Sequence, residues 1–108
     1  MKAGKIVDIQ KTETKSIAEG LSGNVGPITF EIVQKYVDRV VLVKEETLRH
    51  AVYLLWAHDK QVVEGSGAAA VAPVIEDKPF FKDKRVVSVL TGGNIDSNLL
   101  QSILKSER

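Results

Sequence analysis

The residues of this chain best suited to chemistry are Thr91, Gly92, Gly93 and Asn94, which directly follow the apolar segment 85–90. That segment has the composition of a β-strand, and ligands of open α/β sheets lie at the carboxyl ends of strands. Glycine lets a flat ligand approach the backbone, and a threonine hydroxyl can donate or accept a hydrogen bond. The same residues also fit an ordinary turn before a helix. The pattern therefore allows either a small-molecule site or a plain strand-to-helix turn.

Strand-like and helix-like segments alternate along the chain, and these elements must position residues 91–94. Short β-branched or wholly apolar runs predict strands at residues 6–9, 40–43 and 85–90. A wholly apolar run is typical of a strand buried on both faces, which favours a parallel sheet. With short connections between the elements, the alternation predicts an α/β fold in one domain.

Apolar residues at helical spacing predict the helices. They are expected at residues 27–37, 45–60, 68–75 and after residue 96, where Asp96 or Asn94 can serve as the N-cap. The stretches between them, residues 11–26, 61–67 and 79–84, are rich in glycine or in charged residues and are predicted to be loops and turns.

The composition excludes several classes of partner. Fifteen basic and fourteen acidic residues are interspersed along 108 residues, so no basic footprint for nucleic acid or for an anionic membrane is present. No apolar run is long enough to cross a bilayer, and the first residues lack the hydrophobic region of a signal peptide. Without cysteine there is no disulfide and no thiolate metal site. We therefore expect a cytoplasmic protein that binds neither nucleic acid nor membrane.

Five segments resemble one enzyme family. Residues 86–96, VVSVLTGGNID, resemble the closing VVVVLSGGNID of the threonine dehydratases and serine racemases, which belong to the fold-type II pyridoxal-phosphate enzymes. Residues 62–69, VVEGSGAA, resemble VVEGAGAA, and residues 16–20, SIAEG, resemble TIADG. Residues 26–30 and 40–46 are similar to GELTFPI and IVLVSEEEI. The matches keep the family's order and cover nearly the whole chain, but only the closing part of the family's catalytic region.

The resemblance implies a fold, a cofactor and a reaction. Residues 1–108 would be one domain, the C-terminal portion of the catalytic domain, with part of a three-layer α/β structure whose mostly parallel sheet has flanking helices. The complete enzyme would use pyridoxal phosphate to convert threonine or serine into a 2-oxoacid and ammonia.

The resemblance also assigns cofactor contacts. Thr91 corresponds to the family's serine that hydrogen-bonds the pyridine nitrogen, within the cofactor-binding loop formed with Gly92, Gly93 and Asn94. Glu64 corresponds to a glutamate near the cofactor, although an N-cap or loop-anchoring role is equally compatible with its position.

Other parts of the family's active site have no counterpart in this sequence. These are the cofactor-binding lysine motif, the substrate-carboxylate loop, the glycine-rich phosphate loop and the divalent-cation site. Lys82 follows two phenylalanines, as the family's lysine follows one, but its charged neighbours predict an exposed loop. His50 and His58 are too far apart on a helix to share a metal ion. We therefore expect no catalytic residue, no metal site and no bound cofactor in the chain alone.

Two explanations of such a chain remain open. It is either a C-terminal fragment or subunit of a pyridoxal-phosphate-dependent ammonia-lyase, inactive alone, or a non-catalytic oligomerising or regulatory module derived from that fold. In both cases the predicted strands would leave apolar surface uncovered. We therefore expect the chain to form a homodimer or to join a complementing N-terminal half.

Overall fold

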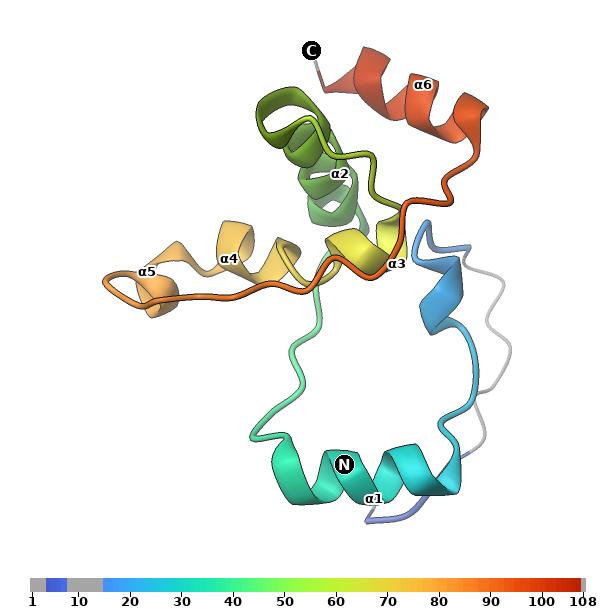
Figure 1. Cartoon of the computed structure of the whole chain (residues 1–108), viewed down its shortest axis with the longest axis vertical. Helices are drawn as coiled ribbons and strands as arrows, with labels where there is room; N and C mark the ends of the chain where they lie inside the picture. Colours follow the sequence, from blue (N-terminus) through green and yellow to red (C-terminus); the bar gives the residue numbers. More distant parts are fainter. Residues whose placement is uncertain (1–3, 8–14, 108) are drawn as a thin grey trace.

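The computed structural model describes residues 4–7 and 15–107 (Figure 1). In chain order the elements are a 3-10 turn and six helices: η1 (Glu19–Leu21), α1 (Pro27–Tyr36), α2 (Glu45–Asp59), α3 (Gly65–Ala68), α4 (Ala72–Glu76), α5 (Lys78–Phe81) and α6 (Ser97–Ser106). Helices α2, α3, α4 and α6 gather at one end, and α1 lies across an opening from them. The extents are 42 × 37 × 19 Å and the radius of gyration is 15.0 Å. A compact domain of this length has a radius of gyration of about 13 Å, so the molecule is flat and open.

The longer predicted helices are confirmed. Helix α1 begins at Pro27 and ends one residue before its predicted end, and α2 ends at Asp59, where Lys60 adopts a left-handed φ of 60°. Helix α6 is capped by Asp96, whose carboxylate accepts hydrogen bonds from the backbone N–H groups of Asn98 and Leu99 at 2.9 and 3.0 Å. A side chain that occupies these unpaired N–H groups fixes where a helix starts.

The segment between α2 and the last extended stretch differs from the prediction. The Gly-Ser-Gly sequence expected to be a turn forms α3, and the helix expected at residues 68–75 is divided into α3 and α4. Pro73 lies in the first turn of α4, where its missing N–H needs no partner, so a new helix starts there. The predicted loop 79–84 contains most of α5, whose start Asp77 caps by accepting from the backbone N–H of Phe80 at 3.3 Å.

The predicted strands do not form within the described residues. Segments 40–43 and 85–90 have no helix or strand assignment, and no hydrogen bond between backbone groups joins either segment to another part of the described chain. Of the predicted strand 6–9, residues 8 and 9 lie outside the described residues, as do residues 11–14 of the predicted loop. A strand exists only with a neighbouring strand to pair with, and the side-chain pattern cannot supply that neighbour. The predicted sheet is therefore not observed in the described part of the chain.

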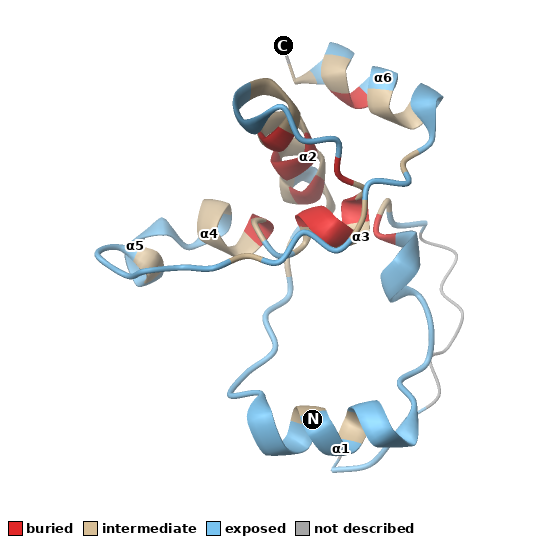
Figure 2. Cartoon of the chain, in the orientation of Figure 1, coloured by how far each residue is buried: buried red, intermediate tan, exposed pale blue. Residues whose placement is uncertain are grey.

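The core is small and centres on α2 (Figure 2). Buried apolar residues come from α2 and from the segments packed against it: Leu48, Ala51, Val52, Leu55, Ala18, Val63, Ala68, Ala72 and Ile103. Ala51, Ala68, Ala72 and Ile103 have no exposed surface, and three alanines let the helix backbones approach closely. In the described part of the chain, no helix has the length and apolar character needed to cross a bilayer.

Glu76 ties the chain entering α2 to the end of α4. Its carboxylate accepts hydrogen bonds from the Thr47 hydroxyl at 2.6 Å and from the Lys44 backbone N–H at 2.7 Å. The Thr47 hydrogen bond, followed by that from Lys44, lowers the pKa of Glu76 below its ordinary value of 4.5. Both hydrogen bonds favour the ionised carboxylate.

The free energy of unfolding should therefore depend on the charge of Glu76. Because its pKa is depressed in the folded state, the stabilisation is present above pH 4.5 and is lost as the pH falls through the lowered pKa. In urea unfolding at a series of pH values, Glu76→Gln should remove this part of the pH dependence. The control is Glu31→Gln, because Glu31 is exposed on α1 and has no partner among the described residues. Identical profiles for Glu76→Gln and the unchanged chain would contradict the prediction.

Candidate functional site

Three segments that are distant in sequence meet around α3. They are residues 16–20, 62–67 and 91–94, and hydrogen bonds join the first and the last of them to the middle one. The Gly20 backbone N–H donates to the Ser66 hydroxyl at 2.9 Å. The Glu64 backbone N–H donates to the Gly92 carbonyl oxygen at 3.1 Å. The turn that carries Thr91 is thereby fixed to the segment that leads into α3.

Glycines allow this close approach of backbone to backbone. A methyl group on Gly93 would lie 2.5 Å from the Val62 carbonyl oxygen, and one on Gly67 would lie 3.0 Å from the Gly92 carbonyl oxygen. One on Gly65 would overlap the Ile17 carbonyl group, and one on Gly92 would overlap a Glu64 carboxylate oxygen. None of these glycines has a positive φ. A side chain at Gly65, Gly67 or Gly93 would press on backbone of another segment, whereas at Gly92 it would displace only the end of the Glu64 side chain.

Glu45 holds the 16–20 segment in place. Its carboxylate accepts hydrogen bonds from the Ser16 hydroxyl at 2.8 Å and from the Ile17 backbone N–H at 2.6 Å. The Ser16 oxygen in turn accepts from the Ala18 backbone N–H at 3.0 Å. The sequence predicts only that a helix begins at Glu45. Its contact with a segment 28 residues away has no local sequence signal.

The sequence-predicted site residues are brought together. Gly92 contacts Glu64 directly, and Thr91, Gly93 and Asn94 lie in the same turn with exposed surfaces. Among the described residues, the side chains of Thr91 and Asn94 have no hydrogen-bond partner, so both are free to meet a ligand. Glu64 is half-buried and immediately precedes α3.

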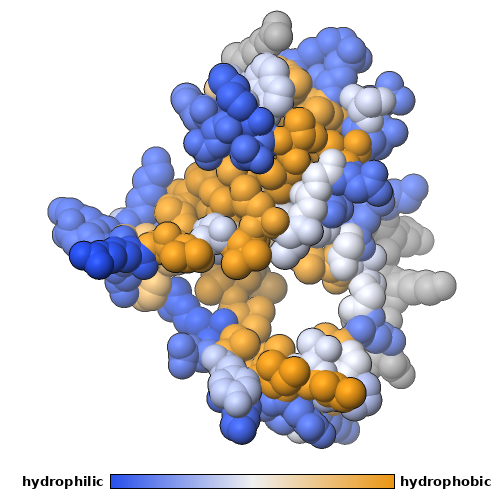
Figure 3. Space-filling view, in the orientation of Figure 1, coloured by the Kyte–Doolittle hydropathy of each residue, from blue (hydrophilic) through white to orange (hydrophobic). Residues whose placement is uncertain are grey.

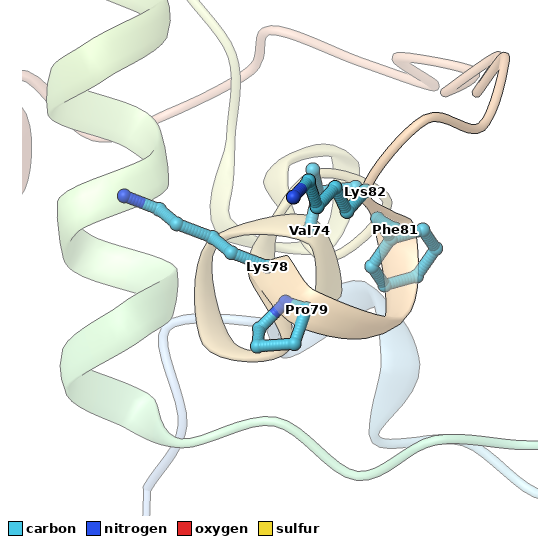
Figure 4. Close-up of a pocket in the computed structure, with 5 residues that line it drawn as sticks. All are labelled: Val74, Lys78, Pro79, Phe81 and Lys82. Atoms are coloured by element: carbon cyan, nitrogen blue, oxygen red, sulfur yellow. The ribbon is translucent and has the colours of Figure 1, made fainter.

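Lys82 lies elsewhere. Together with Val74, Lys78, Pro79 and Phe81 it lines a shallow hollow of about 450 Å³ at the α4–α5 corner, as Figure 4 shows. The hollow shares no residue with the three segments around α3. Lys82 itself is exposed, as predicted.

Phe80, two residues before Lys82, belongs to a surface cluster. Both the Arg39 guanidinium and the Lys84 ammonium lie 4.1 Å from the centre of the Phe80 ring. These are cation–π contacts of a charged surface. The motif that superficially resembles a cofactor-binding lysine is thus part of this exposed corner.

The two histidines lie apart from the site. The His50 ring nitrogen Nδ1 is 2.7 Å from a Glu107 carboxylate oxygen, which joins α2 to the end of α6, and His58 is exposed. The described residues contain no group of three or more His, Asp or Glu side chains arranged to hold a metal ion.

Comparison with known proteins gives the family. The family model described as pyridoxal-phosphate dependent enzyme matches residues 1–92. L-threonine ammonia-lyase of Thermotoga maritima is 42% identical over 90 residues, which are 82% of this chain and 22% of that protein. The crystal structure of T.th. threonine deaminase superposes with a TM-score of 0.73 at 34% identity, covering 88% of this chain and 34% of that one. The crystal structure of serine racemase from Dictyostelium discoideum superposes with a TM-score of 0.73 at 33% identity, covering 88% of this chain and 30% of that one.

The relatives are much longer than this chain. It spans between 22% and 34% of the length of these relatives, and it corresponds to their C-terminal part. The similarity extends over most of this chain, in sequence and in three dimensions, and the family match includes residues 16–20, 62–67, 91 and 92. The chain belongs to the family of pyridoxal-phosphate-dependent enzymes.

Proposed function

We propose that this chain is the C-terminal part of the catalytic domain of a threonine/serine ammonia-lyase, where it forms the side of the cofactor site that faces the ring nitrogen. One observation carries the proposal: the three segments that resemble the family most specifically, residues 16–20, 62–67 and 91–94, meet around α3. The relatives named as L-threonine ammonia-lyase and threonine deaminase support the reaction, which releases ammonia and a 2-oxoacid.

Thr91 suits contact with the ring nitrogen. Its hydroxyl is exposed and has no partner among the described residues, so it can donate a hydrogen bond to an unprotonated nitrogen. When bound, pyridoxal phosphate withdraws electrons from the reacting carbon of the amino acid, and a neutral hydroxyl partner keeps that withdrawal moderate. Gly92 and Gly93 hold Thr91 close to residues 62–64, and Asn94 presents a free amide beside it.

Glu64 contacts the turn of residues 91–94 through both its backbone and its side chain. Its backbone N–H binds the Gly92 carbonyl oxygen, and its carboxylate fills the space beside the Gly92 Cα. We assign it a positioning role, because these contacts orient the turn that carries Thr91. No segment of the sequence resembles the family's cofactor-binding lysine motif or its phosphate loop, and we propose that the chain contributes no catalytic residue of its own.

The remaining assignments concern the complete protein. We propose that residues 40–43 and 85–90 enter a three-layer, mostly parallel sheet with flanking helices when the rest of the catalytic domain is present. We also propose that the chain forms a homodimer or joins a complementing N-terminal half, and that it is cytoplasmic. The absence of cysteine from the sequence is compatible with that compartment.

The Thr91 hydroxyl provides the test. In a chimera in which this chain replaces the matching region of the Thermotoga maritima enzyme, Thr91→Ala removes one hydrogen bond worth roughly 0.5–1.5 kcal/mol, so kcat should fall roughly 2- to 13-fold. Thr91→Ser keeps the hydroxyl and is the matched control. Thr91→Asp should lower kcat further, because a carboxylate favours the protonated ring.

The result separates the two functional classes. Steady-state kinetics with threonine and serine would give the rates, and the far-ultraviolet circular dichroism of each variant would verify its fold. If Thr91→Ala and Thr91→Asp both react as fast as the unchanged chimera, Thr91 does not contact the cofactor. A folded chimera that releases no ammonia would instead favour the non-catalytic alternative.

A further inference from the structure

Ser66 is the one residue of segment 62–69 that differs from the family's VVEGAGAA, which has alanine at this position. The difference adds a hydroxyl to α3. This hydroxyl accepts a hydrogen bond from the backbone N–H of Gly20, 46 positions earlier in the chain, at 2.9 Å. An alanine side chain has no atom that could accept it. The serine therefore makes a contact that the family's motif does not encode.

The end of segment 16–20 that carries Gly20 has little else to hold it. Residues 19–26 are exposed, and from there the chain runs to α1 beside the opening that separates α1 from the other helices (Figure 1). Figure 3 shows hydrophobic side chains on both sides of that opening, which they do not fill. Among the described residues, no other hydrogen bond joins residues 19–22 to a distant segment.

The beginning of the same segment is held differently. Glu45 accepts hydrogen bonds from Ser16 and from the Ile17 backbone, and Gly65 lies against the Ile17 carbonyl group. Neither contact reaches Gly20. The Ser66 hydroxyl therefore fixes the end of the segment that Glu45 does not hold.

Helix α3 also contacts the turn that carries Thr91. Gly67 lies so close to this turn that a methyl group on it would be 3.0 Å from the Gly92 carbonyl oxygen. Ser66 and Gly67 are consecutive, so the same short helix contacts both Gly20 and the turn of residues 91–94. How far the end of segment 16–20 lies from this turn therefore depends on the Ser66 hydrogen bond.

We infer that Ser66 is a positioning residue of the cofactor site, which acts through Gly20 to hold segment 16–20 in the arrangement that binds pyridoxal phosphate. This inference rests on the proposed function and adds a residue to that site. If the segment can leave the arrangement, the fraction of binding-competent protein falls and the apparent dissociation constant rises in proportion. Because Gly20 is exposed, the effect of this hydrogen bond should be roughly 2- to 5-fold, in the lower part of the usual range.

Ser66→Ala is a mild change, because it introduces the residue of the family's own motif. In the full chain, exchange of the Gly20 amide hydrogen, followed by nuclear magnetic resonance, should become roughly 2- to 5-fold faster. Amide exchange at Val52, in the buried part of α2, should not change. Unchanged exchange at Gly20 would overturn the inference.

A double substitution tests the contact from the other side. A methyl group on Gly20 would lie 2.8 Å from the Ser66 hydroxyl oxygen and 3.3 Å from its Cβ. Gly20→Ala should therefore displace the hydroxyl and break the hydrogen bond, and after Ser66→Ala only the Cβ contact remains. In urea unfolding, Gly20→Ala should lower the ratio of folded to unfolded protein roughly 2- to 5-fold more in the unchanged chain than in the Ser66→Ala chain.

The matched control for this cycle is Gly23→Ala. A methyl group on Gly23 would meet no atom within 4 Å, so its effect should be the same with and without the Ser66 hydroxyl. If Gly20→Ala also has the same effect in both chains, Ser66 does not hold Gly20 and the inference is wrong.

The role in the site is tested in the chimera with the remainder of the Thermotoga maritima enzyme. Absorbance titration of the cofactor-free chimera with pyridoxal phosphate gives the dissociation constant, which Ser66→Ala should raise roughly 2- to 5-fold. Ser102→Ala is the control, because the Ser102 hydroxyl donates only to the Leu99 carbonyl oxygen within α6. Circular dichroism verifies that each variant is folded, so that a loss of stability alone would leave the dissociation constant unchanged.

The outcome is distinguishable from failure of the proposed function. A chimera whose cofactor affinity depends on Ser66, but which releases no ammonia, would refute the reaction and leave the role of Ser66 intact. An active chimera that binds pyridoxal phosphate equally well with and without the Ser66 hydroxyl would overturn the inference and leave the reaction intact.

Discussion

A polypeptide with this sequence alone is expected to retain no pyridoxal phosphate after gel filtration and to release no ammonia from threonine or serine. The reason is the content of the site: it offers the Thr91 hydroxyl and a glycine turn, but no lysine that could react with the cofactor and no loop for its phosphate. A cofactor that the protein does not hold in place loses the benefit of orientation, which lowers the activation barrier by roughly 7–11 kcal/mol in favourable cases. The difference from a complete enzyme should thus be many orders of magnitude.

Two measurements check this expectation. Absorbance near the visible edge reports retained pyridoxal phosphate, and a coupled assay reports 2-oxoacid, with the complete Thermotoga maritima L-threonine ammonia-lyase as the positive control. Ammonia release at enzyme-like rates would contradict the expectation. Lys82→Ala would then show whether the exposed lysine at the α4–α5 corner is responsible.

The second large effect is expected at the glycines that pack the three segments together. A methyl group on Gly65 would overlap the Ile17 carbonyl group, and one on Gly93 would lie 2.5 Å from the Val62 carbonyl oxygen. Both neighbours are backbone, which cannot move without displacing its segment. Gly65→Ala and Gly93→Ala should each lower the free energy of unfolding by roughly 1–3 kcal/mol, as overpacking does. For Gly65 this would outweigh the preference of helices for alanine, which is about 1 kcal/mol.

Gly23→Ala is the matched control for both substitutions. Gly23 has no positive φ, and a methyl group there would meet no atom within 4 Å. Urea unfolding followed by circular dichroism gives the three free energies. Equal values for Gly23→Ala, Gly65→Ala and Gly93→Ala would mean that segments 16–20 and 91–94 do not lie against α3.

The parts of this fold that sequence could predict depend on local interactions. Helix α2 follows from the spacing of Leu48, Ala51, Val52 and Leu55, all of which are buried. The start of α6 follows from Asp96, whose carboxylate reaches two N–H groups within the next three residues. Such interactions connect residues close in sequence, so a pattern of residue types contains them.

The remaining features depend on distant neighbours. The apolar runs at residues 40–43 and 85–90 predict strands, but the pairing that would make these segments strands requires polypeptide beyond the segments themselves. The Gly-Ser-Gly sequence looked like a turn, yet it forms α3 because Gly65 and Gly67 lie against the Ile17 and Gly92 backbones. At such positions, tertiary contacts override the intrinsic conformational preference of the residues.

The candidate site also combines local features, which the sequence predicts, with contacts between distant segments, which it does not. The turn of Thr91, Gly92, Gly93 and Asn94 could be recognised from composition and from its place after an apolar segment. Its contact with Glu64, and the two hydrogen bonds by which Glu45 holds residues 16 and 17, join segments that lie far apart in the sequence. No spacing rule predicts contacts of that separation, and only the folded arrangement shows which residues share the site.

Ammonia release by the chimera of this chain with the remainder of the Thermotoga maritima L-threonine ammonia-lyase is the most direct test of whether the chain is part of an ammonia-lyase. The chimera should retain pyridoxal phosphate through gel filtration and convert threonine or serine to a 2-oxoacid, and Thr91→Ala should slow that conversion. A chimera that folds and retains the cofactor but releases no ammonia from either amino acid would contradict the proposed function.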